Sequence, residues 1–283
     1  MKSRVLVAVI AIPLLLMVVF FLPLWAWSIV IGAIACVAAW ELIGAIFPIP
    51  EGERLVNPRR NTFRMRVYSC LAAFLIPLLA SFASPMYSAL AVIFLLFAAL
   101  FCEMMAAFRE ETPVNFPYVS AFLLAGGIIP LFLGSMVRLG LHERSIAYLL
   151  MPLVVSFVSD SGAYFAGLSL GKHKLCPNLS PKKTIEGSIG GFVSTIAAML
   201  IYGLILKLCK MNVNFLVIGI YGLLGSLATQ LGDLCFSAIK RIHGIKDYGN
   251  LLPGHGGMLD RFDGMIWSAA LLELLANWVP AVW

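Results

Sequence analysis

Long apolar runs, separated by short polar or proline-containing breaks, dominate the pattern of this chain. Each run is about 20 residues long, the length that an α-helix needs to cross a hydrocarbon layer of about 30 Å. The pattern therefore predicts an all-α polytopic membrane protein with about nine transmembrane helices. We place these helices at about Val5–Phe21, Trp25–Phe47, Val67–Ser84, Met86–Phe108, Pro117–Leu139, Ile146–Leu170, Ser188–Leu208, Phe215–Ile242 and Arg261–Val282.

Two features near the start of the chain refine this pattern. Pro23 and Pro85 lack a backbone N–H group, so the first two helices and the next two are expected to form tight hairpins. The first run follows Lys2 and Arg4, so it also resembles a cleaved signal peptide. A transmembrane helix is the better interpretation, because further apolar runs follow and a soluble domain does not.

Composition excludes an ordinary soluble domain. The chain is 61% hydrophobic and 12% charged, whereas soluble domains are about 45–50% apolar and about 25% charged. Its six cysteines are scattered and form no CxxC pair, so they predict no zinc or redox site. The formal charge of +6 comes from short loops between helices. Helix orientation and anionic lipid or substrate explain it better than nucleic acid.

The basic residues also predict which side of the membrane is cytoplasmic. Of the 20 lysines and arginines, only Arg138, Arg144, Lys207 and Lys210 fall in loops on one side, and all others fall on the opposite side. The positive-inside rule therefore places the N-terminus in the cytoplasm and the C-terminus outside. We accordingly expect a multi-pass protein of the cell inner (cytoplasmic) membrane.

The two halves of the chain differ in their loops. Residues 1–144 have short or bland loops and are predicted to form an N-terminal transmembrane region that is mainly a scaffold. Its basic connector, Pro48–Arg66, is explained by the positive-inside rule alone. Residues 145–283 have loops rich in Gly, Pro, Lys and His, and they carry carboxylates inside apolar helices. We therefore predict a C-terminal catalytic transmembrane region there.

Asp160 and Asp233 lie inside helices that are otherwise apolar. A charge within a membrane span costs about 3 kcal/mol on insertion scales, so each carboxylate should face a wet cavity and have a partner. A paired structural aspartate is the alternative to a functional one. Because no lysine accompanies them in the apolar part of either span, we expect a cation to neutralise these groups.

The loop between the sixth and seventh helices is rich in residue types that bind phosphate. Lys172, Lys182 and Lys183 supply positive charges. Ser180 and Thr184 add neutral donors, as do the backbone N–H groups at the start of the seventh helix. Such a cluster is often only a topology signal. The sequence SPKKT just before a glycine-rich helix start favours a polyphosphate-binding loop.

The segment from Ser237 to Asp263 holds the densest group of polar residues. Asp260 and Asp263 are three residues apart at the start of the ninth helix, so both carboxylates share one face and can hold one cation. Hard oxygen ligands select Mg²⁺, Mn²⁺ or Ca²⁺. His255 lies among glycines that permit a close approach of the backbone to a ligand. It is either a ligand, proton carrier or phosphate donor, or a hydrogen-bonded loop histidine.

Together these motifs resemble the signature of the phosphatidate cytidylyltransferases, also called CDP-diacylglycerol synthases. The resemblance is detailed in the C-terminal half and rests only on length and hydropathy in the first half. The matching residues are Asp160, Ala163-Tyr164, Gly167, Gly171-Lys172, Ser180-Pro-Lys-Lys-Thr184, Glu186-Gly187, Ser237, Lys240-Arg241, Lys246-Asp247, Pro253, His255-Gly256-Gly257 and Asp260-Arg261-Phe262-Asp263.

The resemblance implies transfer of the cytidylyl group of CTP to phosphatidate, giving CDP-diacylglycerol and diphosphate. It also implies Mg²⁺, with Mn²⁺ as a substitute, a second cation such as K⁺, and a homodimer. Such a reaction needs positioning and charge neutralisation rather than a protein nucleophile. We assign metal binding to Asp233, Asp260 and Asp263, with Asp160 as a further candidate. These three aspartates are also assigned to catalysis, together with Lys240, Arg241 and His255. The residues assigned to binding of CTP or lipid phosphate are Lys172, Ser180, Lys182, Lys183, Thr184, Lys246 and Arg261.

Two other functions stay open from the residues. An ion-coupled transporter also uses intramembrane aspartates, although it does not need the HGG and DRFD motifs and the chain has no evident internal repeat. A polyprenol kinase also uses CTP but transfers its γ-phosphate. The products distinguish the three: diphosphate indicates cytidylyl transfer, CDP indicates a kinase, and solute accumulation in vesicles indicates a transporter.

Overall fold

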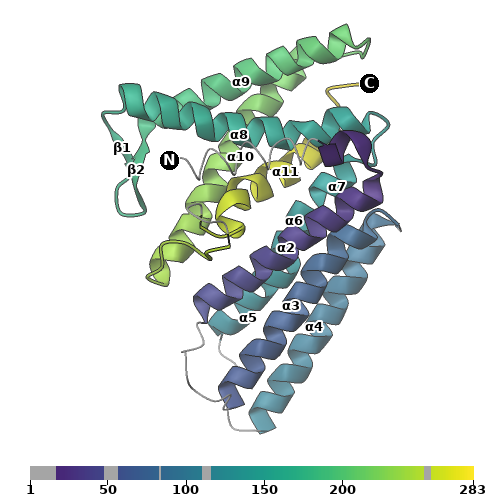
Figure 1. Ribbon diagram of the computed structural model, residues 1–283, viewed down its shortest axis with the longest axis vertical. Coiled ribbons are helices and arrows are strands. Elements are labelled where there is room, and N and C mark those ends of the chain that lie inside the picture. The colour runs from purple at the N-terminus through teal and green to yellow at the C-terminus, as the bar shows by residue number, and fades with distance from the viewer. Residues whose placement is uncertain (1–16, 48–56, 83, 110–115, 252–255) are drawn as a thin grey trace. The chain divides into compact units, whose positions relative to one another are not determined.

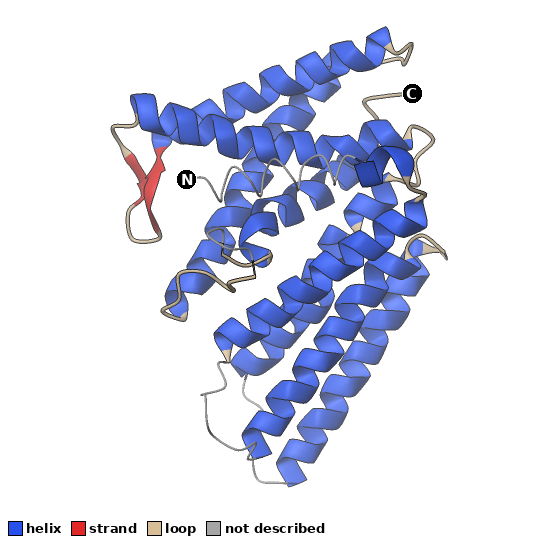
Figure 2. Ribbon diagram, in the orientation of Figure 1, coloured by secondary structure: helices blue, strands red, loops and turns tan. Residues whose placement is uncertain are grey.

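The structure is a computed structural model that describes residues 17–47, 57–82, 84–109, 116–251 and 256–283. Within these ranges the regular elements are helices apart from one short hairpin (Figure 2). Seven of its helices are long and apolar enough to cross a membrane, which confirms a multi-pass, all-helical membrane protein. The elements in order are α2 (Leu24–Ile46), α3 (Asn57–Leu79), α4 (Pro85–Arg109), α5 (Phe116–Leu123), the π-helix η1 (Leu124–Ile128), α6 (Ile129–Leu133), α7 (Ser135–Leu139), α8 (Ser145–Leu170), β1 (Lys174–Cys176), β2 (Ser180–Thr184), α9 (Ile185–Leu208), α10 (Phe215–Ile242) and α11 (Leu259–Trp278).

Two of the nine predicted spans are not among these seven. The first, Val5–Phe21, lies mostly in residues 1–16, outside the described residues. The ninth corresponds to α11, which is helical as expected but carries Asp260, Arg261, Asp263 and Glu273 within 20 residues. The count of nine and the orientation of the termini therefore stay predictions.

The third predicted span begins earlier in the structure than in the sequence analysis. We expected it to start at Val67, whereas α3 starts at Asn57. The apolar run does begin near Val67, but basic residues are good helix formers and extend the same helix towards its N-terminus. Hydropathy therefore located the apolar part of the helix and missed the polar first turns.

The predicted span Pro117–Leu139 forms one candidate membrane crossing that is not a uniform α-helix. It passes through η1, where the N–H of Ile129 donates to the carbonyl of Leu124, five residues back. Pro130 follows immediately and cannot donate to an earlier carbonyl. A single π-turn is a common way for a helix to absorb such a break in its hydrogen bonding.

The chain forms two compact units. The N-terminal unit comprises residues 1–137 and 245–261, and the C-terminal unit comprises residues 138–244 and 262–283. In the first, α2 packs on α3 and α3 on α4 (Figure 1), with Met65, Ile76, Leu96 and Phe122 buried in the core. These units are defined by packing. The boundary at residue 144 that we predicted between a scaffold region and a catalytic region concerns function, and it stays a prediction.

The C-terminal unit is built on α8, α9 and α10, each of which packs against the other two (Figure 1). Its core contains Tyr148, Met151, Ile218 and Tyr221. The hydroxyl group of Tyr221 donates to the carbonyl of Val279 at 2.8 Å, which ties the chain after α11 to α10. These three helices and the hairpin between α8 and α9 position most of the predicted site residues.

Arg138 and Glu273 form a bidentate ion pair in this unit. Arg138 Nε lies 2.6 Å from Glu273 Oε1, and Arg138 Nη2 lies 2.7 Å from Glu273 Oε2. We expect Arg138→Met to destabilise the folded protein by about 3 kcal/mol, because it leaves a largely buried carboxylate unpaired. Thermal unfolding in detergent measures the loss. The double variant Arg138→Met/Glu273→Met should recover most of it, and equal losses in the single and double variants would contradict this explanation.

Candidate active site

The predicted phosphate-binding loop is a β-hairpin that leads directly into α9. β1 and β2 pair antiparallel, with Lys174 opposite Thr184 and Cys176 opposite Ser180. Thr184 then caps α9, because its Oγ1 accepts the N–H of Gly187 at 3.1 Å. The prediction that SPKKT immediately precedes a helix start is confirmed, and Lys182 and Lys183 are held in β2 next to that start.

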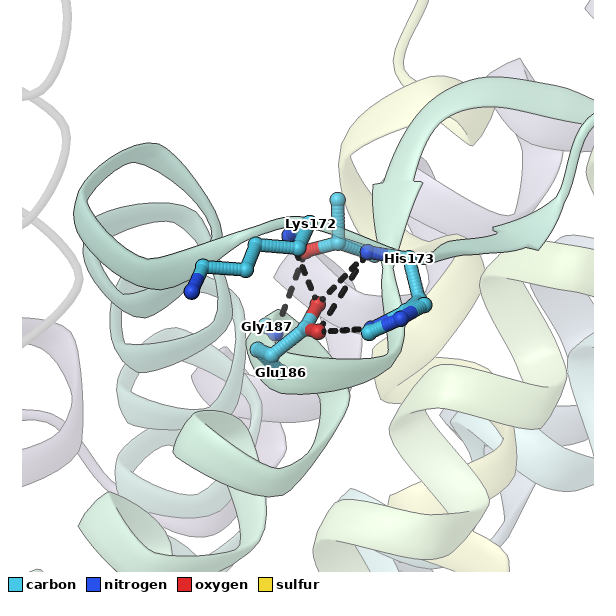
Figure 3. A network of polar contacts seen from close by, with 5 residues as sticks. Lys172, His173, Glu186 and Gly187 are labelled. Carbon is cyan, nitrogen blue, oxygen red and sulfur yellow. Dashed lines mark hydrogen bonds and ion pairs between the residues drawn. The ribbon is translucent and has the colours of Figure 1, made fainter.

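Glu186, in the first turn of α9, fixes the other end of the hairpin (Figure 3). Its carboxylate accepts the backbone N–H groups of Lys172 and His173 at 3.1 and 3.2 Å. It also contacts His173 Nδ1 at 2.6 Å. Lys172 contacts Glu186 through its backbone N–H group. Glu186 therefore closes the loop between α8 and β1. Its place in the motif, two residues after Thr184, brings its carboxylate within reach of that loop.

Glu186→Ala should loosen this loop without unfolding the protein, since the ties that it removes are local. We expect trypsin to cleave after Lys172 and Lys174 several-fold faster in the variant than in the wild type. The thermal unfolding midpoint in detergent should stay near that of the wild type. Equal cleavage rates would mean that the hairpin alone holds the loop closed.

A cavity of about 420 Å³ lies between α8, the hairpin, α9 and α10. One part of its wall is polar and contains both predicted lysines of β2 together with two intramembrane carboxylates. Another part is apolar and contains aromatic and aliphatic side chains from α8 and β1. The lining residues are Asp160, Ala163, Tyr164, Gly167, Leu168, Leu175, Lys182, Lys183, Thr184, Gly187, Ser188, Gln230 and Asp233.

Asp233 is neutralised in the structure by a lysine. Lys183 Nζ lies 2.5 Å from Asp233 Oδ2, and both side chains are partly exposed. The expectation that only a bound cation would neutralise Asp233 is therefore wrong. The apolar part of the span supplies no lysine, and the partner comes instead from the hairpin 50 residues earlier, on the other side of the cavity. A second contact, from the Ser237 hydroxyl to Asp233 Oδ1 at 3.2 Å, holds the carboxylate on α10.

Gln230, which the sequence analysis did not single out, connects three helices beside the cavity. It accepts a hydrogen bond from the Ser188 hydroxyl group on α9 and donates to the Ser188 carbonyl at 3.2 Å. It also donates to Ser226 Oγ at 3.3 Å, which in turn lies 2.8 Å from Ser159 Oγ on α8. An amide in an apolar span is a sequence signal for such a network, because an unpaired polar group within a membrane is costly.

Asp263 is a buried carboxylate with 9% of its surface exposed. It lies close enough to Asp233, Asp160 and the buried Lys240 to interact with them electrostatically. The backbones of α10 and α11 approach closely here. A side chain at Gly232 would collide with the Asp263 carbonyl, and one at Gly264 would collide with Thr229. Two glycines, each next to a predicted aspartate, therefore let the helices bring Asp233 and Asp263 together.

The other predicted site residues differ in their contacts, in their exposure and in the unit to which they belong. Arg241 donates from Nε to the Leu179 carbonyl at 3.2 Å, which ties the end of α10 to the hairpin. Lys172, Lys246 and Arg261 are exposed, and Ser180 is half-buried in β2. Lys246, Asp260 and Arg261 belong to the N-terminal unit. His255 lies outside the described residues, so its prediction is untested.

The Asp260 carboxylate accepts hydrogen bonds from two backbone N–H groups. Its Oδ2 accepts the backbone N–H of Tyr248 at 2.8 Å and that of Gly257 at 3.0 Å. Asp260 therefore joins Tyr248 to Gly257, just before the start of α11. That Asp260 and Asp263 hold one cation together stays a prediction, since the two carboxylates accept hydrogen bonds from different backbone groups.

Among the described residues, no group of three or more His, Cys, Asp and Glu side chains is arranged to hold a metal ion. Asp233 and Asp263 nevertheless provide two carboxylates of the kind that Mg²⁺ uses, and Mg²⁺ commonly takes one or two protein carboxylates and completes its shell with water and substrate phosphate. The residues present therefore fit a cation that the substrate helps to bind.

Comparison with known sequences identifies the family. The profile of the Cytidylyltransferase family matches residues 2–279. This chain belongs to the cytidylyltransferase family. The match includes both halves of the chain, so the family extends to the N-terminal unit as well as to the residues of the cavity.

Individual relatives of this family member carry a more specific name. The chain is 44% identical over 135 residues to the phosphatidate cytidylyltransferase of Bacillus subtilis, which is 48% of this chain and 49% of that protein. It is 36% identical over 161 residues to the protein of that name in Staphylococcus haemolyticus and 37% identical to that in Staphylococcus aureus, each alignment covering 57% of this chain and 61% of the relative. The aligned part thus spans between about half and three fifths of these relatives.

Proposed function

We propose that this protein is an enzyme that transfers the cytidylyl group of CTP to phosphatidate, forming CDP-diacylglycerol and diphosphate for phospholipid synthesis. Family membership and the names of the relatives support this proposal. The observation that carries it is the cavity, in which Lys182 and Lys183 share one space with Tyr164 and Leu168. A lipid phosphate needs such a combination, because its anionic head and its acyl chains require opposite environments.

In the proposed reaction a phosphate oxygen of phosphatidate attacks the α-phosphorus of CTP, and the bond to the β-phosphate breaks to release diphosphate. Lys182 and Lys183 bind and orient phosphate oxygens at the cavity, and Lys240 and Arg241 offset charge near Asp263. Lys172, Ser180, Thr184, Lys246 and Arg261 are further binding residues for CTP or lipid phosphate. Positioning of the two anions, with neutralisation of their charge, supplies the rate enhancement.

Mg²⁺, or Mn²⁺ in its place, is the proposed cofactor, with Asp233 and Asp263 as the ligands that fit best and Asp260 and Asp160 as further candidates. When bound, the cation stabilises the negative charge that develops on the phosphates. A second cation such as K⁺, a catalytic role of His255, a homodimer and a location in the cytoplasmic membrane complete the proposal. Each of these comes from the family resemblance or from the loop charges.

The deciding experiment incubates purified protein with CTP labelled at its cytidine, phosphatidate and Mg²⁺. We expect labelled CDP-diacylglycerol and one equivalent of diphosphate. Chelation of divalent ions should abolish the product, and added Mg²⁺ should restore it. Formation of CDP with a phosphorylated lipid would replace the proposal by a kinase. Full turnover in the presence of the chelator would overturn the metal requirement while leaving the cytidylyl transfer in place.

A further inference from the structure

Glu41 is a buried glutamate in the otherwise apolar helix α2. Only 8% of its surface is exposed. It lies in the half of the chain that we predicted to be mainly a scaffold, and the proposed reaction does not use it. A buried carboxylate is costly unless hydrogen bonds satisfy its oxygens, so its partners indicate its role.

Both oxygens of Glu41 accept backbone hydrogen bonds at the start of α11. The N–H of Met258 donates to Oε1 at 3.0 Å, and the N–H of Leu259 donates to Oε2 at 2.9 Å. The first N–H groups of a helix have no partner within the helix, and the helix dipole favours a negative charge there. Glu41 is thus a helix cap supplied from 217 positions away in the chain.

Two glycines that precede α11 lie directly against this carboxylate. A side chain at Gly249 or Gly257 would collide with the carboxyl group of Glu41. Asp260 binds the same segment from within, through the N–H groups of Tyr248 and Gly257. Two carboxylates therefore fix this backbone, one from α2 and one from α11 itself, and the segment clusters with the N-terminal unit rather than with the C-terminal one.

We propose that Glu41 is a positioning residue for the reaction: by holding the backbone of Met258 and Leu259, it sets where Asp260 and Arg261 lie. The catalytic consequence rests on the proposed function, whereas the anchoring rests on the two hydrogen bonds alone. A displacement of about 1 Å in a reacting group can lower a rate about 100-fold. Through Glu41, the N-terminal region thereby takes part in catalysis by fixing backbone geometry.

The test compares Glu41→Gln with the wild type. The amide keeps the size of the side chain but turns an NH₂ group towards one of the two backbone N–H donors. In the folded variant we expect kcat to fall about 10- to 100-fold, with KM for CTP within about threefold of the wild type. Hydrogen exchange of peptides covering residues 256–262 should become about tenfold faster, as expected for loss of a helix cap.

Two further variants separate positioning from general destabilisation. Glu103 is also buried in the N-terminal unit, where it pairs with Arg64 at 2.6 Å, so Glu103→Gln should lower the unfolding temperature and leave kcat and exchange at residues 256–262 unchanged. Gly249→Ala should reproduce the defect of Glu41→Gln. In a Glu41→Ala background, the same Gly249→Ala change should add nothing, because the colliding carboxyl group is gone.

The outcomes are distinct. Slower turnover with faster local exchange in Glu41→Gln supports the proposal. Wild-type exchange at residues 256–262 overturns the anchoring, and fast exchange with wild-type kcat overturns the catalytic role. If the wild type forms no CDP-diacylglycerol at all, the proposed function fails, and the exchange measurement still decides whether Glu41 anchors the start of α11.

Discussion

Asp263→Asn is expected to lower kcat for CDP-diacylglycerol formation about a thousandfold, which is near the upper end of what removal of one charge-stabilising group costs. Asp263 is buried and lies within electrostatic range of Asp233, Asp160 and Lys240. The change removes the negative charge of the group that we propose as a metal ligand and leaves its size intact. The amide oxygen can still accept the N–H of Gly264, which the carboxylate binds at 2.7 Å. We therefore expect the fold to survive while turnover is lost.

The measurement is the initial rate at saturating CTP, phosphatidate and Mg²⁺, together with the unfolding midpoint in detergent. Glu273→Gln is the matched control. Glu273 is another poorly exposed carboxylate of α11, paired with Arg138 and not placed in the site. That variant should lose stability and keep its kcat per folded molecule. A purified Asp263→Asn protein that makes product at the wild-type rate would remove Asp263 from the proposed metal site.

Lys183→Met is expected to reduce kcat/KM about a hundredfold. In the structure Lys183 neutralises Asp233 at 2.5 Å, and both residues line the cavity. In addition to this ion pair, Lys183 is one of the two lysines that we propose to bind phosphate oxygens. The methionine side chain keeps most of the length of lysine and removes its charge. The variant therefore loses both the ion pair and the phosphate contact.

A charge exchange tests whether the pair is only structural. Lys183→Asp/Asp233→Lys can rebuild an ion pair with reversed charges, which should restore much of the thermal stability that either single change loses. It should not restore turnover, because the cation and the carboxylate have exchanged sides of the cavity. Lys207→Met is the control, since Lys207 is exposed in the last turn of α9. If the exchanged variant turned over near the wild-type level, the Lys183–Asp233 pair would have only a structural role.

The helices and the local motifs were predictable because their signals are local. A run of apolar residues specifies a membrane helix whatever surrounds it, so the bounds of α8 and α10 agree with prediction to within one residue at each end. The SPKKT segment was predicted as a loop before a helix start, and the hairpin is the local structure that it forms. The π-turn in η1 was missed, because hydropathy is the same for a π-helix and an α-helix.

The sequence by itself therefore determined the class of protein, the family, most spans, and which polar residues deserve attention. Only the tertiary structure decided how those residues pair. Lys183 neutralises Asp233, Gln230 joins three helices, and Glu41 caps a helix that begins 218 positions further on. Hydropathy and spacing report on neighbours within a few turns of one helix, whereas each of these contacts joins segments that only the packing of helices brings together.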